Sequence, residues 1–279
     1  MLRLLVHICI KIHSMLTRSC SGTDLISIKY LKFNLGSVAT VRFQETRTGD
    51  LKTISLILPA RNEAGIIREQ LQRLQCYRAK GHEIIVIDGG SVDATVEQTT
   101  GLVDRCEVSA VGRSNQMNHG ASGAKGDILL FLHVDTVLPV NADEGICKAL
   151  SGHDSRWGWF DVKLSKAQLG FRMVASMMNL RARLTSVPTG DQALFVQREL
   201  FQEVGGFPQL ALMEDIAISK LLRCQERPAS PAGLVITSSR RWEENGLIST
   251  ILLMWKLRFF YFIGMKPQRL RDMYYISND

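Results

Sequence analysis

Three short apolar segments in the middle of the chain constrain the fold most, because each ends abruptly in a proline, a glycine pair or an acid. They cover residues 54–59, 83–88 and 127–135. Segments of this length that are apolar on both faces are typical of strands buried inside a parallel sheet. Residues 63–79 carry apolar side chains at helical spacing and complete a strand–helix–strand unit. We therefore predict an α/β fold whose mostly parallel central sheet is flanked by helices.

The composition is that of a globular protein with a sizeable core. Of the 279 residues, 46% are hydrophobic and 22% are charged, which excludes the disordered and collagen-like classes. The six cysteines are widely spread and form no C-x-x-C pair. This spacing argues against a disulfide framework, a zinc ribbon and a thioredoxin-type redox site, and it favours a cytoplasmic location.

The chain is basic, with 34 Lys and Arg against 27 Asp and Glu, a net charge of +7. Such an excess is compatible with nucleic acid, an anionic membrane face or a phosphorylated small molecule. The sequence has no basic tract with interleaved aromatics, no zinc-finger spacing and no RNA-recognition signature. We therefore expect no nucleic-acid partner. An anionic membrane face or a phosphorylated small molecule remains as the expected partner.

The chain is predicted to have three parts. Residues 1–50 show no strong periodicity, and Arg3, His7 and Lys11 interrupt the apolar beginning of the chain, so we predict neither a signal peptide nor a membrane span there. We expect an N-terminal extension over 1–50 that either is poorly ordered or precedes the natural start of the protein, and that has no part in the chemistry. A main domain over 51–245 and an amphipathic helical segment over 246–279 follow.

The apolar stretch 247–265 approaches the width of a bilayer, but Lys256 and Arg258 near its middle disfavour spanning. On a helix, an apolar side is available from Ile251, Met254, Trp255 and Phe262, with Arg269 and Arg271 just beyond. Two alternatives stay open. The helix either lies on the inner face of the plasma membrane as a peripheral contact, or it packs on the core as a terminal helix.

Further elements are predicted between the third apolar segment and this tail. Strands are expected at 157–160 and 193–196, and a short helix at 198–204. A longer helix is expected over 168–184, and its spacing assigns two faces. Its inward side chains are predicted to be Phe171, Val174, Met178 and Leu184, and its outward ones Arg172, Arg181 and Arg183.

Polar residues follow the first two predicted strands. Right-handed crossovers place the carboxyl ends of parallel strands at one edge of the sheet, where open α/β sheets bind ligands. The segment 88–93, Asp-Gly-Gly-Ser-Val-Asp, could grip a nucleoside through backbone amides and a carboxylate, or it could be an ordinary strand–turn–helix junction. Neither G-x-G-x-x-G nor a P-loop is present. The segment 59–63 at the end of the preceding strand strengthens the nucleoside interpretation.

The third strand ends in two potential metal ligands. On an extended segment His133 and Asp135 would lie on the same side. The hard oxygens of Asp135 suit Mg²⁺ or Mn²⁺, although an isolated His-x-Asp is often structural. A phosphatase-like D-x-D-x-T motif is excluded, since His133 stands where that chemistry needs its nucleophilic aspartate.

Two further segments carry charged groups. Glu214 and Asp215 open an apparent helix, where they either favour the helix N-terminus or form a pair in which one raised pKa makes a general base. The segment 240–242, Arg-Arg-Trp, offers cations for phosphate and an aromatic face for a sugar. Its alternative is a solvated basic turn.

Taken in order, these segments over residues 52–275 resemble family-2 glycosyltransferases with the GT-A fold. The similar segments are 55–63, 84–95 and 112–127, followed by His133-Val-Asp135 at the position of the family's D-x-D motif. The chain also resembles a bacterial subgroup associated with radical-SAM or selenium-domain proteins, through its FLHxDT, GDQALF, GGFP, MEDI and RRW segments. The resemblance implies a GT-A fold and makes 51–245 a glycosyltransferase domain.

The resemblance also implies roles for individual residues. Asp215 would be the catalytic base with Glu214 beside it, Asp135 the metal ligand with His133 at the second position, and Asp88 the contact to the nucleotide base, with Arg113 near the nucleotide. The full nucleotide-sugar set is Pro59, Ala60, Arg61, Asn62, Glu63, Asp88, Gly89, Gly90, Ser91, Arg113, Gln116 and Asn118. The acceptor or phosphate set is Gly190, Asp191, Gln192, Arg241 and Trp242.

The expected activity is an inverting transfer of a sugar from a nucleoside-diphosphate sugar, with UDP as the expected nucleotide, to a hydroxyl acceptor that the apolar tail suggests is lipidic. A divalent cation, Mn²⁺ or Mg²⁺, is expected to assist. Two departures from the family pattern matter: His133 replaces the first acid of the metal motif, and Ser238-Ser239 stand where processive synthases carry glutamine. The alternatives are a catalytically inactive nucleotide-sugar sensor or membrane scaffold and, more remotely, a nucleotidyltransferase.

Overall fold

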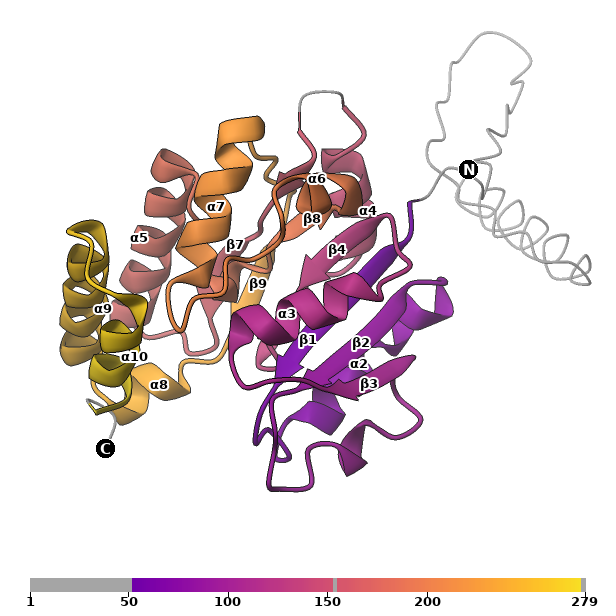
Figure 1. The fold of residues 1–279 in the computed structure, drawn as a ribbon, viewed down its shortest axis with the longest axis horizontal. Helices are drawn as coiled ribbons and strands as arrows, with labels where there is room; N and C mark the ends of the chain where they lie inside the picture. Colours follow the sequence, from indigo (N-terminus) through magenta and orange to yellow (C-terminus); the bar gives the residue numbers. More distant parts are fainter. Residues whose placement is uncertain (1–51, 153–154, 277–279) are drawn as a thin grey trace, which may run out of the picture. The chain divides into compact units, whose positions relative to one another are not determined.

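A computed structural model describes residues 52–152 and 155–276 (Figure 1). The N-terminal extension predicted over 1–50 lies outside these residues. From Lys52 onward the chain forms one compact unit.

The main sheet has six strands in the order β3-β2-β1-β4-β8-β6. The four strands β3, β2, β1 and β4 are parallel, and β8 and β6 continue the sheet in antiparallel pairing. Their bounds are β1 Ile54–Ala60, β2 Glu83–Asp88, β3 Arg105–Val108, β4 Ile128–Phe131, β6 Trp157–Gly158 and β8 Phe195–Gln197. The prediction of a mostly parallel sheet is confirmed, and Ala60 and Asp88 are register partners at its carboxyl edge.

A second, three-stranded sheet has the order β5-β9-β7. Its strands are β5 Thr136–Val137, β7 Asp161–Leu164 and β9 Leu234–Thr237. β5 follows β4 after a short turn, so the chain passes from the large sheet to the small one at the point where residues 133–135 lie. This turn therefore stands at the junction of the two sheets.

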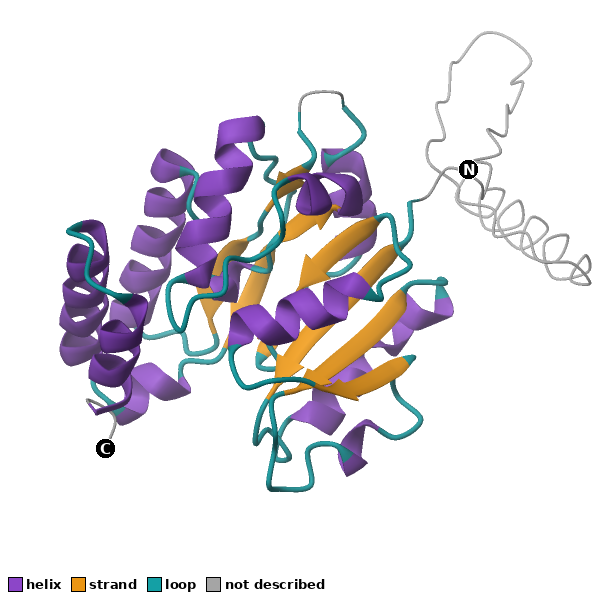
Figure 2. Cartoon of the chain, in the orientation of Figure 1, coloured by secondary structure: helices purple, strands orange, loops and turns teal. Residues whose placement is uncertain are grey.

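Helices cover both faces of the main sheet (Figure 2). They are α2 Ile67–Ala79, α3 Arg113–Ser122, α4 Ala142–Ala149, α5 Leu169–Thr185, α6 Arg198–Glu203, α7 Glu214–Gln225, α8 Arg240–Glu244, α9 Leu247–Phe262 and α10 Pro267–Ile276, with 3₁₀ turns η1 Glu97–Thr99 and η2 Gly190–Gln192. Side chains alternate between the faces of β1, as in any strand. Leu56 and Leu58 pack in a core with Leu71 of α2, whereas Ile57 packs in a second core with Met117 of α3.

Two boundary predictions were wrong. β4 ends at Phe131, so His133 and Asp135 lie in the turn before β5 instead of on an extended strand. The helix predicted from residue 63 begins at Ile67, because the Glu63 backbone N–H is bound by the Thr95 hydroxyl at 2.8 Å and residues 61–66 form a turn. The local pattern gave the element types, and tertiary hydrogen bonds moved their ends.

The predicted faces of α5 are only partly right. Phe171 and Val174 are buried as expected, but Leu184 is 76% exposed. Arg181, predicted to point outward, is half-buried, and its Nε and Nη2 atoms are fully shielded from solvent. α5 therefore carries an arginine on its inward side and apolar side chains on its outer one.

The tail combines features of both alternatives left open by the sequence. Ile251 of α9 packs against α5, and Leu257 is fully buried with Leu270 of α10. Trp255 and Phe262 nevertheless stay 61% and 84% exposed. Within the described part of the chain, no helix combines the length and the apolar character that crossing a membrane requires.

Candidate active site

The loops that follow β1 and β2 are tied together at the carboxyl edge of the sheet. The Asn62 backbone N–H donates to the Ser91 hydroxyl at 2.8 Å, and Asn62 Oδ1 accepts from the Val92 backbone N–H at 2.9 Å. Asn62 adopts a left-handed backbone, φ 55°, which asparagine tolerates better than most residues. The two segments predicted to bind the nucleotide thus form one braced surface.

Asp88 lies at the end of β2 and is almost fully buried. Its Oδ2 accepts from the backbone N–H groups of Gly90 and Ser91, both at 2.9 Å, and its Oδ1 accepts from the Ser91 hydroxyl. Both carboxylate oxygens therefore hold the turn in shape. The expected contact of Asp88 with a nucleotide base stays a prediction.

Gln116 and Asn118 of α3 also bind protein groups. Gln116 Nε2 donates to the carbonyls of Ala60 and Ile87 at 2.9 and 2.8 Å, which braces the ends of β1 and β2. Asn118 exchanges two hydrogen bonds with the backbone of Phe207, at 2.8 and 2.9 Å. These residues shape the candidate nucleotide surface from behind. Of the remaining members of the predicted set, Arg61 and Gly90 are exposed and Gly89 is buried.

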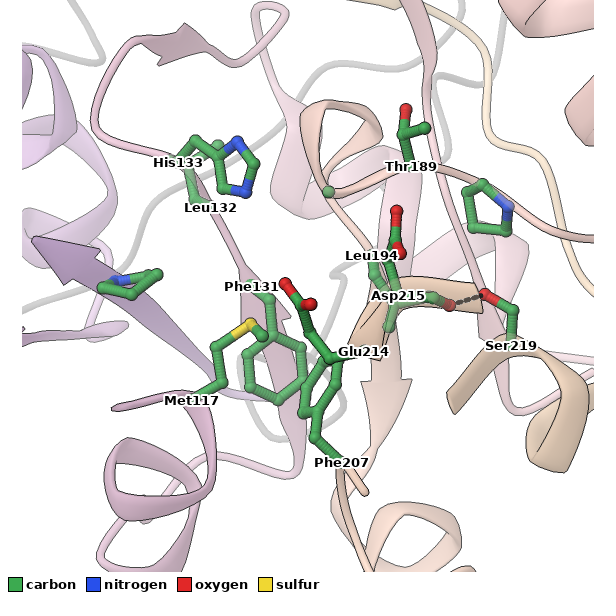
Figure 3. A pocket seen from close by; sticks show the side chains of 13 residues that line it. Met117, Phe131, Leu132, His133, Thr189, Leu194, Phe207, Glu214, Asp215 and Ser219 are labelled. Carbon is green, nitrogen blue, oxygen red and sulfur yellow. Dashed lines mark hydrogen bonds between the residues drawn. The ribbon is translucent and has the colours of Figure 1, made fainter. Parts of the chain in front are cut away.

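A small, partly open pocket lies between the sheet edge and α7 (Figure 3). Pro59, Met117, Phe131 and Phe207 supply apolar walls. The polar side chains come from distant segments: His133 from the turn after β4, Thr189 from the loop before η2, and Glu214 and Asp215 from the start of α7. The structure therefore brings five of the predicted site residues into one pocket: Pro59, His133, Gly190, Glu214 and Asp215.

Arg113, at the start of α3, is surrounded by carboxylates. Burial alone would lower the pKa of its guanidinium, but Glu214, Asp191, Asp215 and Asp135 together raise that pKa. The side chain nevertheless reaches solvent. The charge of Arg113 therefore influences all four carboxylates, although Asp135 lines a different pocket from Glu214 and Asp215.

The two acids of α7 differ in their surroundings. Glu214 is buried, and burial together with the charge of Asp215 raises its pKa, against the influence of Arg113 and His133. Asp215 is half-buried, and its Oδ1 accepts from the Ile216 backbone N–H at 2.8 Å. Ser219 donates to the Asp215 carbonyl at 2.6 Å and holds the first helical turn (Figure 3). Both carboxylates project into the pocket.

His133 is turned toward η2. Its Nδ1 lies 3.1 Å from Asp191 Oδ1, and its ring packs over Gly190, where an added Cβ would lie 2.6 Å from Nε2. Burial alone would raise the pKa of Asp191. The hydrogen bond and charge of His133, together with the charges of Arg113 and Arg241, outweigh burial, so the pKa is lowered. His133 thus fixes the position of the Asp191 carboxylate.

The predicted metal pair is split. Asp135 lines a second, wider pocket with Gln70, Thr237 and Arg240, whereas His133 lines the pocket with Glu214. Among the described residues, no cluster of three or more histidine, cysteine or acidic side chains could enclose a metal ion. Asp135 alone fits a cation that keeps most of its ligands as waters and substrate phosphates, the usual arrangement for Mg²⁺.

The remaining predicted acceptor residues lie outside the pocket. Gln192 is fully buried and accepts from the Thr189 backbone N–H at 3.0 Å. Trp242 packs on α5. Arg241 lies over the ring of Tyr274, 4.4 Å from its centroid, although its charge still influences Asp191.

Sequence reasoning missed Arg181 and Arg258. Their charges interact with Asp215, which places both near the acidic pair. The spacing of Phe171, Val174 and Met178 continues to position 181 at helical intervals, so the inward side of Arg181 could have been predicted from the sequence. No comparable signal marks Arg258.

The carboxyl edge of the parallel sheet carries two loops that hydrogen bonds tie together. An acidic turn follows β4, and a later helix begins with paired acids. This combination defines the architecture of GT-A glycosyltransferases. Solved structures support this class. The chain is similar to S. aureus TarS 1-349, with TM-score 0.55, 19% identity and coverage of 67% of this chain and 60% of that one. It is also similar to the mannosyltransferase PcManGT from Pyrobaculum calidifontis, solved with GDP-Man and Mn²⁺, with TM-score 0.54, 17% identity and coverage of 83% and 70%.

Sequence comparison gives the family. The profile of glycosyl transferase family 2 matches residues 55–201, more than half of the chain, and the protein belongs to this family. An uncharacterised glycosyltransferase of Mycobacterium tuberculosis (strain CDC 1551 / Oshkosh) is 29% identical over 169 residues, which cover 56% of this chain and 62% of that protein. The match thus spans less than two thirds of that relative. The predicted family and GT-A fold are confirmed; no comparison supports the link to radical-SAM or selenium-domain proteins.

Proposed function

We propose that the protein transfers a sugar from a nucleoside-diphosphate sugar to a hydroxyl acceptor, with inversion at the anomeric carbon. The observation that carries this proposal is the single pocket formed by the turn after β4, the loop at η2 and the acidic start of α7. The cation of Arg113 interacts with the acids that face it. The anionic donor would bind on the side of Arg113, and the acceptor hydroxyl would lie beside the acidic pair.

The proposed reaction is a direct displacement. Asp215 takes the proton of the acceptor hydroxyl, the acceptor oxygen bonds to the anomeric carbon, and the bond from that carbon to the diphosphate breaks. Arg113 is proposed to stabilise the negative charge of the departing diphosphate. Glu214 holds a proton more readily than an ordinary glutamate, which limits the negative charge beside Asp215.

Asp135 would hold the divalent cation. When bound, Mn²⁺ or Mg²⁺ would supply partial neutralisation of the diphosphate charge. The side chain of His133 is engaged with Asp191, so we assign it to positioning that carboxylate instead of binding metal. Chelation of the metal and the Asp135→Ala substitution should weaken donor binding alike, and calorimetry with UDP would measure both.

The donor is proposed to carry UDP. TarS 1-349 has been solved with UDP-GlcNAc, and PcManGT with GDP-Man, so both nucleotides occur among proteins of this fold. The braced surface of Asn62, Ser91 and Asp88 is the expected site for the base. Titration with UDP and GDP would identify the nucleotide, and equal affinity for both would contradict the assignment.

The decisive experiment is the Asp215→Asn substitution. Loss of general-base catalysis is expected to reduce transfer by about 10²–10⁴-fold, while UDP affinity is retained. The exposed Asp272, changed to Asn, is the matched control. Normal turnover in Asp215→Asn would remove the base from the proposed mechanism.

The second candidate is a nucleotide-sugar sensor or membrane scaffold without catalysis. The observation that favours it is His133, which stands in place of an acid and is committed to Asp191. Such a protein would bind nucleotide sugars in the presence of Mn²⁺ but would neither hydrolyse them nor transfer the sugar. A panel of radiolabelled donors assayed for turnover separates the two candidates.

A peripheral contact with the inner face of the plasma membrane forms part of the proposal. α9 exposes Ile248, Leu252, Trp255, Phe259 and Phe262, which recur at helical intervals along one side. Lys256 is exposed on the same helix. Cosedimentation with phosphatidylglycerol vesicles should fall when Trp255 and Phe259 are replaced by serine; unchanged cosedimentation would exclude this surface as the contact.

A further inference from the structure

Two arginines at the junction of α5, α7 and α9 have no partner of their own. The Nε and Nη2 atoms of Arg181 are buried and make no hydrogen bond. Arg258 is half-buried and, within the residues that the structure describes, takes part in no hydrogen bond or ion pair. Buried guanidinium groups normally find such partners, because burying an unsatisfied charge is costly.

The two cations also oppose each other. Burial, together with the charge of Arg258, lowers the pKa of Arg181 to about 10, and burial lowers the pKa of Arg258. The charge of Asp215 acts to raise the pKa of both arginines, and the charge of Asp191 acts to raise the pKa of Arg181 only. Lys220 of α7 is exposed and lies over the ring of Tyr261 of α9, 5.1 Å from its centroid. The two arginines thus share Asp215 as a nearby anion without forming an ion pair with it, and a bound anion would compensate their charges.

Two buried acids elsewhere in the protein are ion-paired, although each keeps one buried oxygen without a hydrogen bond. Asp143 is bound by Lys80 at 2.7 Å, and Asp161 is bound by Arg183. Arg181 and Arg258 differ from these two acids because neither has an ion-pair partner among the described residues. Groups that are costly in the free protein are typical of sites that a ligand completes.

The position of the pair indicates which substrate it would meet. Both arginines interact with Asp215, the proposed base, and they belong to helices on the side of the molecule away from β2 and β3 (Figure 1). The candidate nucleotide surface is on the loops after β1 and β2. An anion held by the arginines would thus belong to the acceptor.

The surroundings of the junction are apolar on their outer side. α5 exposes Leu169, Met173, Met177, Leu180 and Leu184, and α9 carries the exposed apolar side chains described above. α5 and α9 pack together where Gly170 meets Leu247. An amphiphile could therefore rest its apolar part on these helices while its polar end reaches the arginines.

We propose that Arg181 and Arg258 form a subsite for a phosphate group carried by the acceptor, close to the hydroxyl that Asp215 activates. Two guanidinium groups match the charge of a phosphate dianion and can bind its oxygens in pairs. This inference rests on the proposed function, because it takes the acceptor to lie beside Asp215. It assigns the acceptor to the phosphorylated hydroxyl compounds, either free or as a lipid headgroup.

The test uses the whole protein, the variants Arg181→Gln and Arg258→Gln, and the exposed Arg172→Gln as control. The soluble probe is glycerol 3-phosphate, compared with glycerol; the lipid probe is phosphatidylglycerol in phosphatidylcholine vesicles, compared with phosphatidylcholine alone. Each Gln variant should weaken the binding of at least one phosphate probe by about tenfold or more, the effect expected for losing hydrogen bonds to a charged group. Binding of the vesicles alone would identify the source as a lipid.

Thermal denaturation adds a readout that does not need turnover. Phosphate probes should raise the melting temperature of the wild type and of Arg172→Gln but not of the two Gln variants. The Gln variants should fold at least as stably as the wild type, because each removes an uncompensated buried charge. Arg181→Lys keeps the charge but loses the paired geometry, and should bind phosphate with intermediate affinity.

The outcomes separate this inference from the proposed function. Arg-dependent phosphate binding without sugar transfer would support the subsite and the sensor candidate. Transfer to hydroxyl acceptors that is unaffected by both Gln substitutions would overturn the subsite and leave the transferase standing. A parallel loss of UDP affinity would assign the arginines to the donor diphosphate and overturn the subsite as well.

Discussion

Two regions of the molecule differ in whether their polar side chains find partners within the protein. At the carboxyl ends of β1 and β2, the side chains of Asn62, Asp88 and Gln116 are all engaged in hydrogen bonds within the protein. At the junction of α5, α7 and α9, Arg181 lacks partners and Glu214 is buried beside a second acid. These polar side chains at the ends of β1 and β2 are satisfied, and those at the helical junction are not.

This difference distinguishes the residues that hold the loops in shape from those that are available for chemistry. Residues that a motif marks as ligand contacts can be the ones that hold the loops in shape, as Asp88 does. Reactivity needs charges that the protein has not neutralised, and these gather where α7 meets α5 and α9. The following predictions test this contrast through stability, from the largest expected change to the smallest.

The Asp88→Ala substitution should lower the free energy of unfolding by about 3 kcal/mol, because three donors lose a charged acceptor. Urea denaturation measures this. Asp88→Asn retains one acceptor oxygen and should recover part of the loss. If Asp88→Ala left stability unchanged and abolished UDP binding, Asp88 would be a ligand contact and the contrast between the two regions would fail.

The Gly190→Ala substitution should cost about 2 kcal/mol, since the new methyl group would meet the His133 ring at 2.6 Å. The displaced ring would also lose Asp191, so transfer should fall as well. Gly65, where an added Cβ meets no atom within 4 Å, is the matched control. Equal melting temperatures for the two alanine variants would show that His133 is not fixed against Gly190.

The Glu214→Gln substitution should raise the free energy of unfolding at neutral pH by about 1 kcal/mol while it lowers transfer. The pKa of Glu214 is raised in the folded protein, so the folded state favours the protonated form. Ionised Glu214 destabilises the folded protein. This loss of stability develops as the pH rises from 4.5, the ordinary pKa of a glutamate, through the raised pKa of Glu214 in the folded protein. The gain should therefore vanish in acid, and the exposed Glu244→Gln should show none.

The smallest effect is expected at His82. Its Nδ1 accepts from the Ile54 backbone N–H at 3.2 Å, and its Nε2 lies 3.3 Å from Asp143 Oδ2. Burial lowers its pKa from 6.5, against the influence of Asp143. The unfolded chain therefore takes up a proton first as the pH falls, and stability decreases below about pH 6.5.

The His82→Asn variant tests this dependence. Its melting temperature should fall less than that of the wild type between neutral pH and about pH 5, because it has no imidazole to protonate. The acid loss that arises from Asp143, whose pKa is lowered by Lys80 and His82 against burial, sets in at lower pH. Identical slopes in the two proteins would show that His82 does not contribute.

Much of the fold could be predicted from local patterns. The apolar segments at 54–59 and 83–88 became β1 and β2, and Glu214 does begin a helix. The third segment was only partly right, because β4 stops at Phe131 and the chain turns into the second sheet. A pattern of apolar residues indicates a strand but not where another sheet takes over the chain.

The site was predicted less completely. The pocket does unite His133, Glu214 and Asp215, as the order of motifs suggested. Motif position could not show that Gln192 is fully buried or that His133 points to Asp191. It also could not reveal Arg258, because the charge of a residue does not say which side of its helix meets the protein.

The sequence by itself determined the parallel sheet, the family and the acids at the strand and helix ends, because these depend on periodicity and on the order of short segments. Only the tertiary structure decided which of those polar groups are satisfied and which are not. Whether a side chain is neutralised depends on atoms that approach it from distant segments, as Asp215 approaches Arg181 and Arg258. That balance of charge and burial is a property of packing, and no single segment of the chain contains it.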